Sequence, residues 1–411
     1  MSKRKTPVLR FKGFHNDWEQ RKLGDIATPI KTYSLTRAFE TLKNTNFKYI
    51  HYGDIHTGKA KIIQNPSTLP TIKKNDNYIT LKTNDIIIAD ASEDYKGIAD
   101  AAILKDCGNY KIVAGLHTIA IRPNSCNVSS FIYILLGRDD FKHWGYKVGT
   151  GLKVFGITLK NFLKYKTFYP SLNEQKAISN LLNLVDNLLD LQKRKYEELK
   201  LIKKFLLQNM FADKVPYPNL RFNNFTSEWK LQYLGKLFRR NNERNKKNIF
   251  KIDHTITVSK MKFNINGNGA APTSICTYKV LRTGDVAFEG NRHTKYPFGQ
   301  LIINDIGDGI MSPRFASIRP KYKLNISHWK YFLHYEPLVH NILVMSTKSG
   351  TLMNELVYSD LFKQNIFLPE NSEQIKIGKI LNIIDYKINL QKRYILKLKS
   401  IKNFLLQNMF V

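Results

Sequence analysis

The segment SLNEQKAISNLLNLVDNLLDLQKRKYEELKLIKKFLLQNMF, at residues 171–211, occurs again as ENSEQIKIGKILNIIDYKINLQKRYILKLKSIKNFLLQNMF at residues 370–410. The copies align without a gap, and 21 of 41 positions are identical. Residues 174–211 contain no glycine or proline, while Pro170 and Pro369 stand just before each copy. Ser171 and Glu174 have the spacing of a capping box. Each copy is therefore expected to form one helix of about 38 residues, roughly 57 Å long at 1.5 Å per residue.

Apolar residues recur along both copies at alternating spacings of three and four, which is the pattern of a coiled coil. Glutamine and lysine interrupt this seam at the same places in both copies, and such polar residues fix register and partner. We expect the two helices to pair antiparallel within the chain; the alternative is that each binds a helix of another protein. Leu181, Leu188 and Phe205 lie off the seam and are available to further partners. The predicted seam consists of Ile178, Leu182, Val185, Leu189, Gln192, Tyr196 and Leu199, paired with Ile377, Leu381, Ile384, Ile388, Gln391, Ile395 and Leu398.

A second repeat opens each half of the chain. PVLRFKGFHNDWEQRKLGDIA (7–27) and PNLRFNNFTSEWKLQYLGKLF (218–238) share eight of 21 positions. Between opening and helix the halves have diverged, with faint echoes such as TNDIII (83–88) and TGDVAF (283–288). A whole domain plus a connector is therefore duplicated. The predicted organisation is a first domain at 1–170, a central helix at 171–212, a second domain at 213–368 and a C-terminal helix at 369–411.

The diverged blocks, 28–168 and 239–367, contain short β-prone runs separated by turn residues, such as DIIIAD (85–90) and GDVAFEG (284–290). Helical stretches are expected at about 129–143 and 327–345. We predict α/β or α+β domains whose loops carry the binding function.

The charge of the chain indicates a polyanionic partner. Lys and Arg number 65 against 33 Asp and Glu, a formal charge of +32. An AT-rich genome explains many lysines but not the shortage of acids, so we expect nucleic acid as the partner. Cys107, Cys126 and Cys276 have no metal-binding spacing, so neither a zinc site nor a disulfide framework is expected. No apolar run is long enough for a membrane span and the N-terminus does not resemble a signal peptide, so we predict a cytoplasmic protein.

Two pairs of polar loops are the candidate DNA-binding sites. In each block one loop follows a β-prone run and the other precedes the last stretch before the helix. Arginine can bind guanine, asparagine can pair with adenine, and a carboxylate can accept a hydrogen bond from cytosine N4; solvated loop charges are the alternative for any one residue. The candidates are Asp90, Ser92, Glu93, Tyr95, Lys96, Thr150 and Lys153 in the first block, and Glu289, Asn291, Arg292, His293, Lys295, Tyr296, Lys348, Ser349 and Thr351 in the second.

Catalytic motifs are not evident. Residues 53–60, GDIHTGKA, nearly spell a phosphate-binding loop, but Ala60 replaces the Ser or Thr that would bind Mg²⁺, and a β-prone run follows instead of a helix. The glycines at 266–269 open no helix. No metalloprotease, hydrolase or amino-methyltransferase motif is present, so we expect a binding protein without catalytic residues, metal or cofactor of its own.

The doubled architecture resembles the specificity subunits of type I restriction–modification systems. The opening PxLRFxxFxxxWxxxxLG, at Pro7–Gly24 and Pro218–Gly235, resembles the start of their target-recognition domains, and EQxxI…LQKR…FLLQNMF resembles their conserved helices. The resemblance covers nearly the whole chain. It implies that two domains each read half of a bipartite site on double-stranded DNA, while the paired helices set the spacer between the halves.

The resemblance also implies partner subunits. Two methyltransferase subunits would supply chemistry based on S-adenosylmethionine, and motor–nuclease subunits would use ATP and Mg²⁺. Two alternatives remain at this stage: a self-sufficient DNA methyltransferase or nuclease, and a coiled-coil DNA-binding protein without sequence specificity.

Overall fold

The chain folds into two compact units, each of which contains one of the diverged blocks. The computed structural model describes residues 5–92, 97, 99–151, 155–267, 269, 271–351 and 353–411. Unit 1 comprises Met1–Leu191 and Ile395–Val411, and unit 2 comprises Gln192–Tyr394. Each unit therefore includes part of both repeated helical segments. The domain boundaries expected from the sequence stay a prediction.

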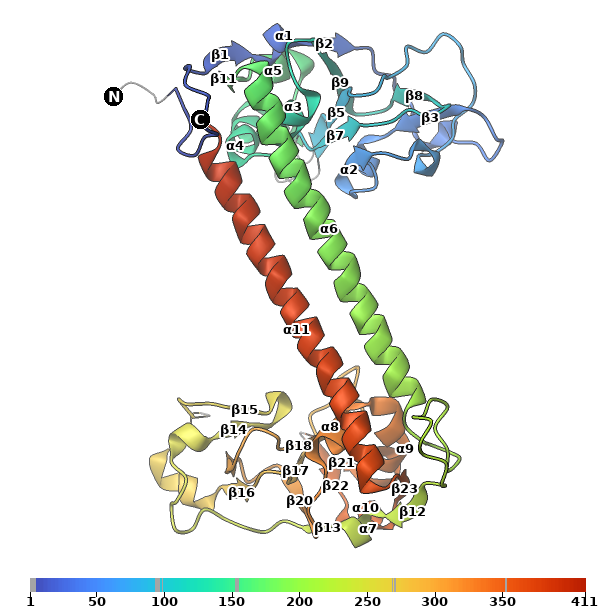
Figure 1. Cartoon of the computed structure of the whole chain (residues 1–411), viewed down its shortest axis with the longest axis vertical. Helices are drawn as coiled ribbons and strands as arrows, with labels where there is room; N and C mark the ends of the chain where they lie inside the picture. Colours follow the sequence, from blue (N-terminus) through green and yellow to red (C-terminus); the bar gives the residue numbers. More distant parts are fainter. Residues whose placement is uncertain are drawn as a thin grey trace. The chain divides into compact units, whose positions relative to one another are not determined.

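The two repeated segments form the longest helices. They are α6 (Leu172–Asn209) and α11 (Asn371–Asn408), each of 38 residues and drawn as continuous ribbons in Figure 1. This confirms the predicted helices. Continuous helical spacing of apolar residues and the absence of internal glycine and proline explain why neither is interrupted.

Unit 1 is built on a five-stranded sheet in the order β2-β9-β5-β7-β4. Its central strands are antiparallel, and β4 joins the edge in parallel. A parallel pair, β3-β8, and two antiparallel pairs, β1-β11 and β6-β10, complete the strands. In chain order they are β1 (Glu19–Lys22), β2 (Ala27–Ile30), β3 (Phe47–Ile50), β4 (Ile62–Ile63), β5 (Ile86–Ala89), β6 (Ala91–Ser92), β7 (Ala101–Leu104), β8 (Lys111–Ala114), β9 (Thr118–Pro123), β10 (Phe155–Gly156) and β11 (Lys166–Tyr169).

Unit 2 repeats the central four strands, in the order β13-β20-β17-β18, all antiparallel. Four antiparallel pairs accompany this sheet: β12-β23, β14-β15, β16-β19 and β21-β22. The strands are β12 (Lys230–Tyr233), β13 (Phe238–Arg240), β14 (Ile256–Thr257), β15 (Lys262–Phe263), β16 (Lys279–Leu281), β17 (Val286–Glu289), β18 (Gln300–Ile303), β19 (Gly309–Met311), β20 (Ala316–Pro320), β21 (Thr347–Ser349), β22 (Asn354–Leu356) and β23 (Asn365–Leu368).

Short helices complete both units, and the mixed α/β class predicted from the sequence is confirmed. The stretches expected at 129–143 and 327–345 are each divided in two, because Gly137 caps the first helix of one pair and a proline opens the second helix of the other. Unit 1 contains α1 (Leu23–Ile26), α2 (Tyr52–His56), α3 (Ser129–Leu136), α4 (Asp139–Val148) and α5 (Leu159–Leu163); unit 2 contains α7 (Leu234–Leu237), α8 (Ile326–His334), α9 (Glu336–Ser346) and α10 (Tyr358–Lys363). Short 3₁₀ turns occupy Arg37–Phe39, Pro66–Thr68, Ile252–His254, Val258–Lys260 and Pro272–Thr277.

A buried ion pair explains the faint echoes between the two blocks. In unit 1 the Arg122 guanidinium donates to the Asp85 carboxylate at 2.8 and 2.6 Å, and in unit 2 Arg319 donates to Asp285 at 2.8 and 2.7 Å. Both aspartates are almost fully buried. The pair links the start of one central strand to the end of its neighbour, so both halves keep these residues while surrounding positions change.

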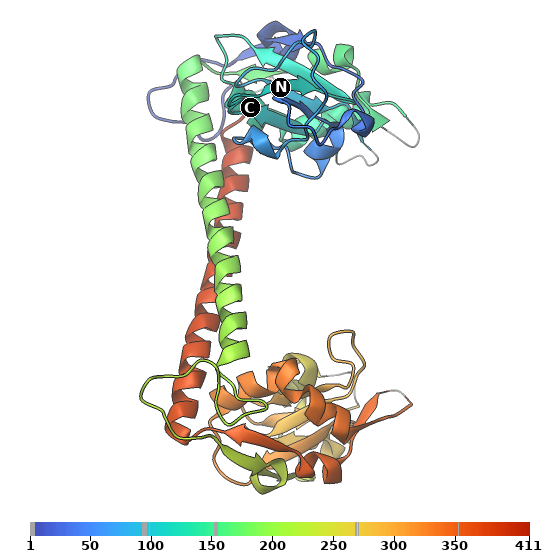
Figure 2. The same cartoon turned by 90° about the vertical axis from the view of Figure 1, so that its right-hand side faces the viewer.

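The helices pack against each other antiparallel within each unit. In unit 1, Ile178, Leu182 and Val185 of α6 share a core cluster with Leu405 of α11 and with Met409, which directly follows α11. The corresponding cluster of unit 2 joins Leu206 of α6 and Met210, which directly follows α6, to Ile377, Leu381 and Ile384 of α11. Figure 2 shows the ends of both helices beside the strands of each unit, so the seam also forms part of each unit's core.

Polar pairs fix the register of the seam. The Gln391 side chain donates to the Gln192 backbone carbonyl at 3.1 Å and also to the side-chain oxygen of that glutamine. In unit 2 Lys203 Nζ lies 2.6 Å from Asp385 Oδ1, and in unit 1 Lys402 Nζ lies 2.5 Å from Asp186 Oδ1. The residues that interrupt the apolar pattern therefore find their partners on the other helix.

The opening motif is held by the start of each long helix. Arg10 Nε lies 2.7 Å from Glu174 Oε1, and Arg221 Nε lies 2.8 Å from Glu373 Oε1. Both carboxylates are 1% exposed or less. The predicted capping box is only half formed: the Ser171 hydroxyl accepts a bond from the Glu174 N–H at 3.4 Å, but the Glu174 carboxylate binds Arg10 instead of the cap backbone.

Each opening motif also meets a helix C-terminus. The Leu9 N–H donates to the Asn408 carbonyl at 2.8 Å in unit 1, and the Leu220 N–H donates to the Asn209 carbonyl at 2.8 Å in unit 2. Figure 1 shows the C-terminus lying beside the first strands of unit 1. The two ends of the repeat unit thus close on each other in the same way in both halves.

Candidate DNA-recognition sites

The two candidate loops of unit 1 lie next to each other. Strand β5 ends at Ala89, and β6, which follows Asp90, pairs with β10. Just before β10, Thr150 and Gly156 exchange both backbone hydrogen bonds, at 3.0 and 2.9 Å. The loop after β5 and the loop after α4 therefore form one surface. Glu93, Tyr95, Lys96 and Lys153 lie outside the described residues.

A histidine cluster that the sequence analysis did not identify lies beside this surface. The His117 ring nitrogen Nδ1 is 3.2 Å from Asp90 Oδ1. His56 Nδ1 is 3.3 Å from Asp100 Oδ2, and His56 Nε2 is 2.9 Å from the Ala91 carbonyl. The hydrogen bond from Asp100 raises the pKa of His56, and burial raises the pKa of Asp90. Because α2, β6 and β9 bring these residues together from distant positions, no spacing in the sequence marks them.

The two candidate loops of unit 2 are joined in an equivalent way. The loop after β17 meets the β21–β22 hairpin, because the Asn354 N–H donates to the Gly290 carbonyl at 2.8 Å. The Arg292 guanidinium donates to the Gly350 carbonyl at 3.2 Å. Lys348 Nζ lies 3.2 Å from Glu355 Oε2, with both side chains more than half exposed. Both units thus present a composite loop surface at the same end of the same central strand.

The candidate residues divide by exposure. Asp90 and Tyr296 are half-buried, whereas Ser92 is only 4% exposed within β6 and Glu289 is 4% exposed at the end of β17. The others in the described part of the chain are exposed: Thr150, Asn291, Arg292, His293, Lys295, Lys348, Ser349 and Thr351.

Unit 2 also contains a cavity that the sequence analysis did not identify. It has a volume of about 420 Å³ and is bordered by two of the candidates, Glu289 and Asn291. The further lining residues come from β14, the 3₁₀ turn after it, the position just before β16 and the segment between β19 and β20, so no local motif in the sequence indicates them. They are Ile256, Thr257, Val258, Ser259, Tyr278, Ser312, Arg314 and Phe315.

No group of three or more histidines, cysteines or carboxylates that could hold a metal ion occurs among the described residues. Within that part of the chain, no helix combines the length and the apolar character needed to cross a bilayer. Residues 53–60, which nearly spell a phosphate-binding loop, form α2 and a turn and are followed by β4 instead of a helix.

Two units of one architecture, with equivalent polar loop surfaces, paired helices and a charge of +32, define a duplicated DNA-recognition protein. Residues 15–201 match the family described as the type I restriction modification DNA specificity domain. The type I restriction enzyme MjaIX specificity subunit of Methanocaldococcus jannaschii is 23% identical over 95% of this chain and 92% of its own length. The MjaVIII specificity subunit of the same organism is 24% identical over 51% of each chain.

Solved structures share the fold along nearly the whole chain. The S subunit of a type I restriction–modification system from M. genitalium superposes with a TM-score of 0.58 at 14% identity, covering 99% of both chains. A chain from a study of complex assembly and conformational transition of the type I restriction–modification system gives a TM-score of 0.54 at 15% identity, covering 97% of this chain and 98% of its own. This chain is therefore similar to type I restriction–modification specificity subunits: residues 15–201 match their specificity domain, and the likeness to the MjaIX subunit extends over 95% of the chain.

Proposed function

We propose that each unit reads one half of a bipartite DNA sequence through its composite loop surface. The observation that carries this proposal is the repetition of one loop arrangement, at the end of β5 and at the end of β17, with different side chains in the two copies. Identical loops would read identical sequences, whereas different side chains on one frame suit two different half-sites.

The positive charge of the chain is consistent with separate residues providing affinity for the DNA backbone and recognition of the bases. Lysines and arginines contribute affinity through phosphate contacts and counter-ion release, without sequence information. Sequence discrimination then falls to the few polar side chains that reach base edges, such as Asn291 and Arg292, which are both exposed beside β17.

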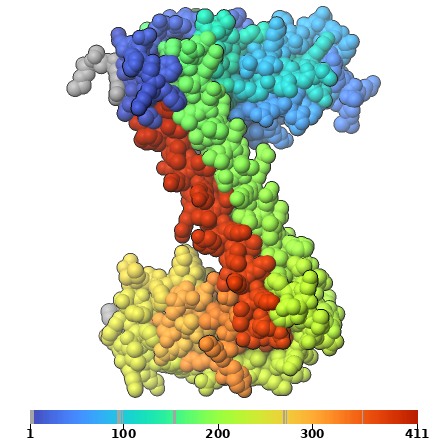
Figure 3. Space-filling view, viewed as in Figure 1, coloured from blue at the N-terminus to red at the C-terminus, as the bar shows by residue number. Residues whose placement is uncertain are grey.

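We further propose that the outer sides of the long helices bind two copies of one partner, a methyltransferase subunit. Leu184, Leu191 and Phe205 follow one another at multiples of seven residues, so they lie along one side of α6. They are 65%, 58% and 55% exposed, and their counterparts on α11 are exposed as well. Figure 3 shows surfaces of both helices open on one face of each unit. The matched apolar positions are Leu184/Ile383, Leu191/Leu390, Ile202/Ile401 and Phe205/Phe404.

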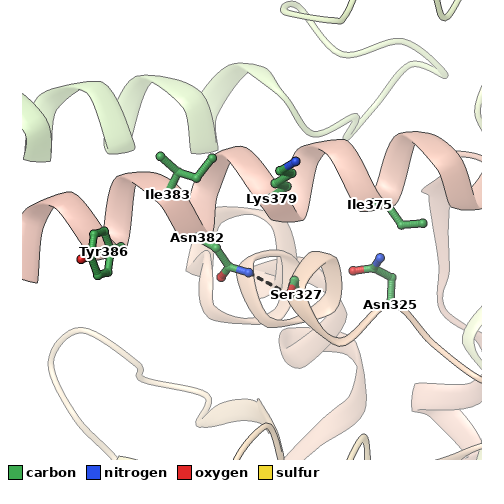
Figure 4. A pocket seen from close by; sticks show the side chains of 7 residues that line it. All are labelled: Asn325, Ser327, Ile375, Lys379, Asn382, Ile383 and Tyr386. Carbon is green, nitrogen blue, oxygen red and sulfur yellow. Dashed lines mark hydrogen bonds between the residues drawn. The ribbon is translucent and has the colours of Figure 1, made fainter.

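The two partner surfaces are not identical. On unit 2 a groove of about 460 Å³ runs between α11 and the start of α8, where Asn382 donates to the Ser327 hydroxyl at 2.9 Å (Figure 4). Ile375 and Tyr386 line this groove, and the first copy has Lys176 and Asn187 at the aligned positions. A helix or loop of the partner would therefore find a more apolar contact on unit 2.

The proposal assigns no chemistry to this chain. S-adenosylmethionine, ATP and Mg²⁺ would be bound by the methyltransferase and motor–nuclease subunits, and this chain would position those subunits at the site. Methylation of a base within duplex DNA requires the base to leave the stack, so the methyltransferase has to be placed beside its target. A methyl-transfer assay and an S-adenosylmethionine binding measurement on the isolated chain are both expected to be negative.

Sequencing of methylated bases in DNA from cells with and without this chain tests the proposal, the methyltransferase partner being present in both. We expect a new split motif with methylation on both strands. An unchanged methylation pattern, with the partner shown to be active, would contradict the proposal and favour a DNA-binding protein without sequence specificity.

A further inference from the structure

The carboxylate of Glu289 is unusual among the acids of this chain, because it is buried without a cation. The residue is 4% exposed at the end of β17, where it faces the cavity described above. Its hydrogen-bond partner in the described structure is the Asn291 N–H, which donates to Glu289 Oε1 at 3.3 Å. No lysine, arginine or histidine of the described residues forms an ion pair with it, although other buried acids such as Asp285 and Glu373 each have an arginine.

Burying a carboxylate without a cation raises the free energy of the folded chain. An ionised carboxylate out of water needs several hydrogen-bond donors, since it can accept about four bonds, and one long bond leaves most of that capacity unused. A stabilising role in the core would call for a paired cation or a neutral side chain. The burial of Glu289 beside an open cavity is therefore explained by a donor that arrives with a ligand.

The walls of the cavity indicate what that ligand is. Val258, Tyr278 and Phe315 are buried and apolar, so they suit the flat faces of a ring. The rim carries Asn291, Ser259 and Arg314, all exposed, and the Arg314 guanidinium lies 4.6 Å from the centre of the Phe315 ring. A cavity lined by these three buried side chains, a buried carboxylate and an exposed guanidinium suits an amino-bearing aromatic ring attached to a phosphate chain.

We propose that this cavity receives a base of the half-site read by unit 2, and that Glu289 accepts a hydrogen bond from its exocyclic amino group, N4 of cytosine or N6 of adenine. Arg314 contacts the adjoining phosphate. This assignment rests on the proposed DNA-recognition function and adds a specificity-determining residue to it. The aligned position in unit 1 is Ala89, so the contact belongs to one half-site alone.

The test uses the full chain together with its methyltransferase partner, and it compares Glu289→Gln and Glu289→Ala with the wild type. The control is Asp360→Asn, an acid on α10 of the same unit that faces solvent beside Lys363. Sequencing of methylated DNA first gives the wild-type motif. We expect both Glu289 variants to relax or change one position in one half-site and to leave the other half-site and the control unchanged.

A second measurement separates recognition from folding. Duplexes carrying the wild-type motif are prepared with one amino group removed at a time, 2-pyrimidinone replacing cytosine or purine replacing adenine. At one position the wild type should lose about tenfold in affinity, while the Glu289→Ala variant should show no further loss at that position. The Glu289→Gln variant should unfold at the same temperature as the wild type or higher, because it removes an unpaired buried charge.

The outcomes are distinct. If the wild type reads a split motif and the Glu289 variants read the same motif with unchanged affinity, the assignment of Glu289 is wrong while the proposed function stands. A fall in the unfolding temperature of Glu289→Gln without a change in the motif would show a structural role instead. If the wild type itself shows no sequence preference, the proposed function fails first.

Discussion

The long helices and the recognition blocks of this chain have diverged to very different extents. The helical segments keep 21 of 41 positions, including the residues that form cross-helix pairs, whereas the blocks keep little more than their strand order and the Asp–Arg pair at Asp85/Arg122 and Asp285/Arg319. The difference shows where each constraint acts. A helix seam fixes almost every residue that faces it, while a sheet frame leaves its loops free to change.

The largest expected effect comes from exchanging one of the variable blocks. We expect that replacing residues 28–168 with the corresponding block of another type I specificity subunit gives a complex with an altered DNA motif. One half-site of that motif should be new, while the other half-site and the spacer should be unchanged. The Arg10–Glu174 pair and the bonds between the two long helices lie outside residues 28–168, so the exchange leaves them in place. Sequencing of methylated DNA checks this, and a change in both half-sites would contradict the independence of the two units.

Much of the fold follows from the sequence because its signals are local or repeated. The spacing of apolar residues predicts α6 and α11 to within a few residues, and Gln192 and Lys203 mark polar pairs across the seam. The Arg10–Glu174 pair spans 164 residues, yet both partners recur as Arg221 and Glu373, so the repeat contains a signal that the sequence analysis did not use.

The candidate sites follow from the sequence only in part. The two loop pairs are placed by the repeat, and the structure brings each pair together. The cavity around Glu289 and the contacts of His56 and His117 are formed by residues from several separate elements. These residues are far apart in the sequence, so no spacing pattern predicts that they lie together. Ala89 and Glu289 occupy equivalent strand ends and both are buried, so the burial of a carboxylate at this position depends on tertiary packing that the sequence does not show.

The ion pairs at the two helix starts, Arg10–Glu174 and Arg221–Glu373, should contribute different amounts to the free energy of unfolding. Glu373→Ala should lower the free energy of unfolding by about 3–5 kcal/mol, because Arg221 loses a buried partner. Glu174→Ala should cost about 1 kcal/mol less, since the Trp229 indole N–H donates to Glu373 at 3.1 Å whereas the Trp18 indole N–H is buried without a partner in the described structure. Urea unfolding, followed by hydrogen exchange in each unit, measures both losses. A larger loss for Glu174→Ala would contradict the comparison.

Of the two aspartates that bind a lysine across the helix pair, the one in unit 2 should also contribute more to stability. Asp385 accepts from Lys203 at 2.6 Å and from the Tyr331 hydroxyl at 2.8 Å, whereas Asp186 accepts a hydrogen bond from Lys402 at 2.5 Å and, in the described part of the chain, has no tyrosine equivalent to Tyr331 bonded to it. We expect Asp385→Ala to cost about 1–3 kcal/mol and Asp186→Ala less than about 1 kcal/mol. Thermal unfolding of the two variants compares them, and equal losses would show that the tyrosine bond contributes little.

Acid should destabilise unit 2 through His328. Burial lowers the pKa of this ring to about 3, so the folded chain keeps it neutral while the unfolded chain binds a proton below about pH 6.5. The stability from this group is complete above pH 6.5 and falls as the pH drops, by roughly 1 kcal/mol between pH 6.5 and 5.5. In unit 1 the raised pKa of His56 acts in the opposite direction.

A single variant isolates the contribution of His328. His328→Phe removes this titrating ring and should therefore flatten the pH dependence of thermal unfolding of unit 2 between pH 7.5 and 5.5. The substitution breaks no hydrogen bond of His328 Nδ1, which has no partner in the described structure. An unchanged slope would mean that other groups cause the acid sensitivity.

The most direct test of the account lengthens the helix pair. Seven residues, one heptad, are inserted into α6 after Leu191 and seven into α11 after Tyr394. Because the helices are antiparallel, both insertions lie on the unit 1 side of the bond between Gln192 and Gln391, so that bond is kept while both helices grow together. The added rise is about 10.5 Å, or roughly three base pairs of DNA. If the helices set the spacing between the two readers, the methylated motif keeps both half-sites and its spacer grows by about three base pairs. An unchanged spacer, in a variant that still methylates both half-sites, would contradict the central claim.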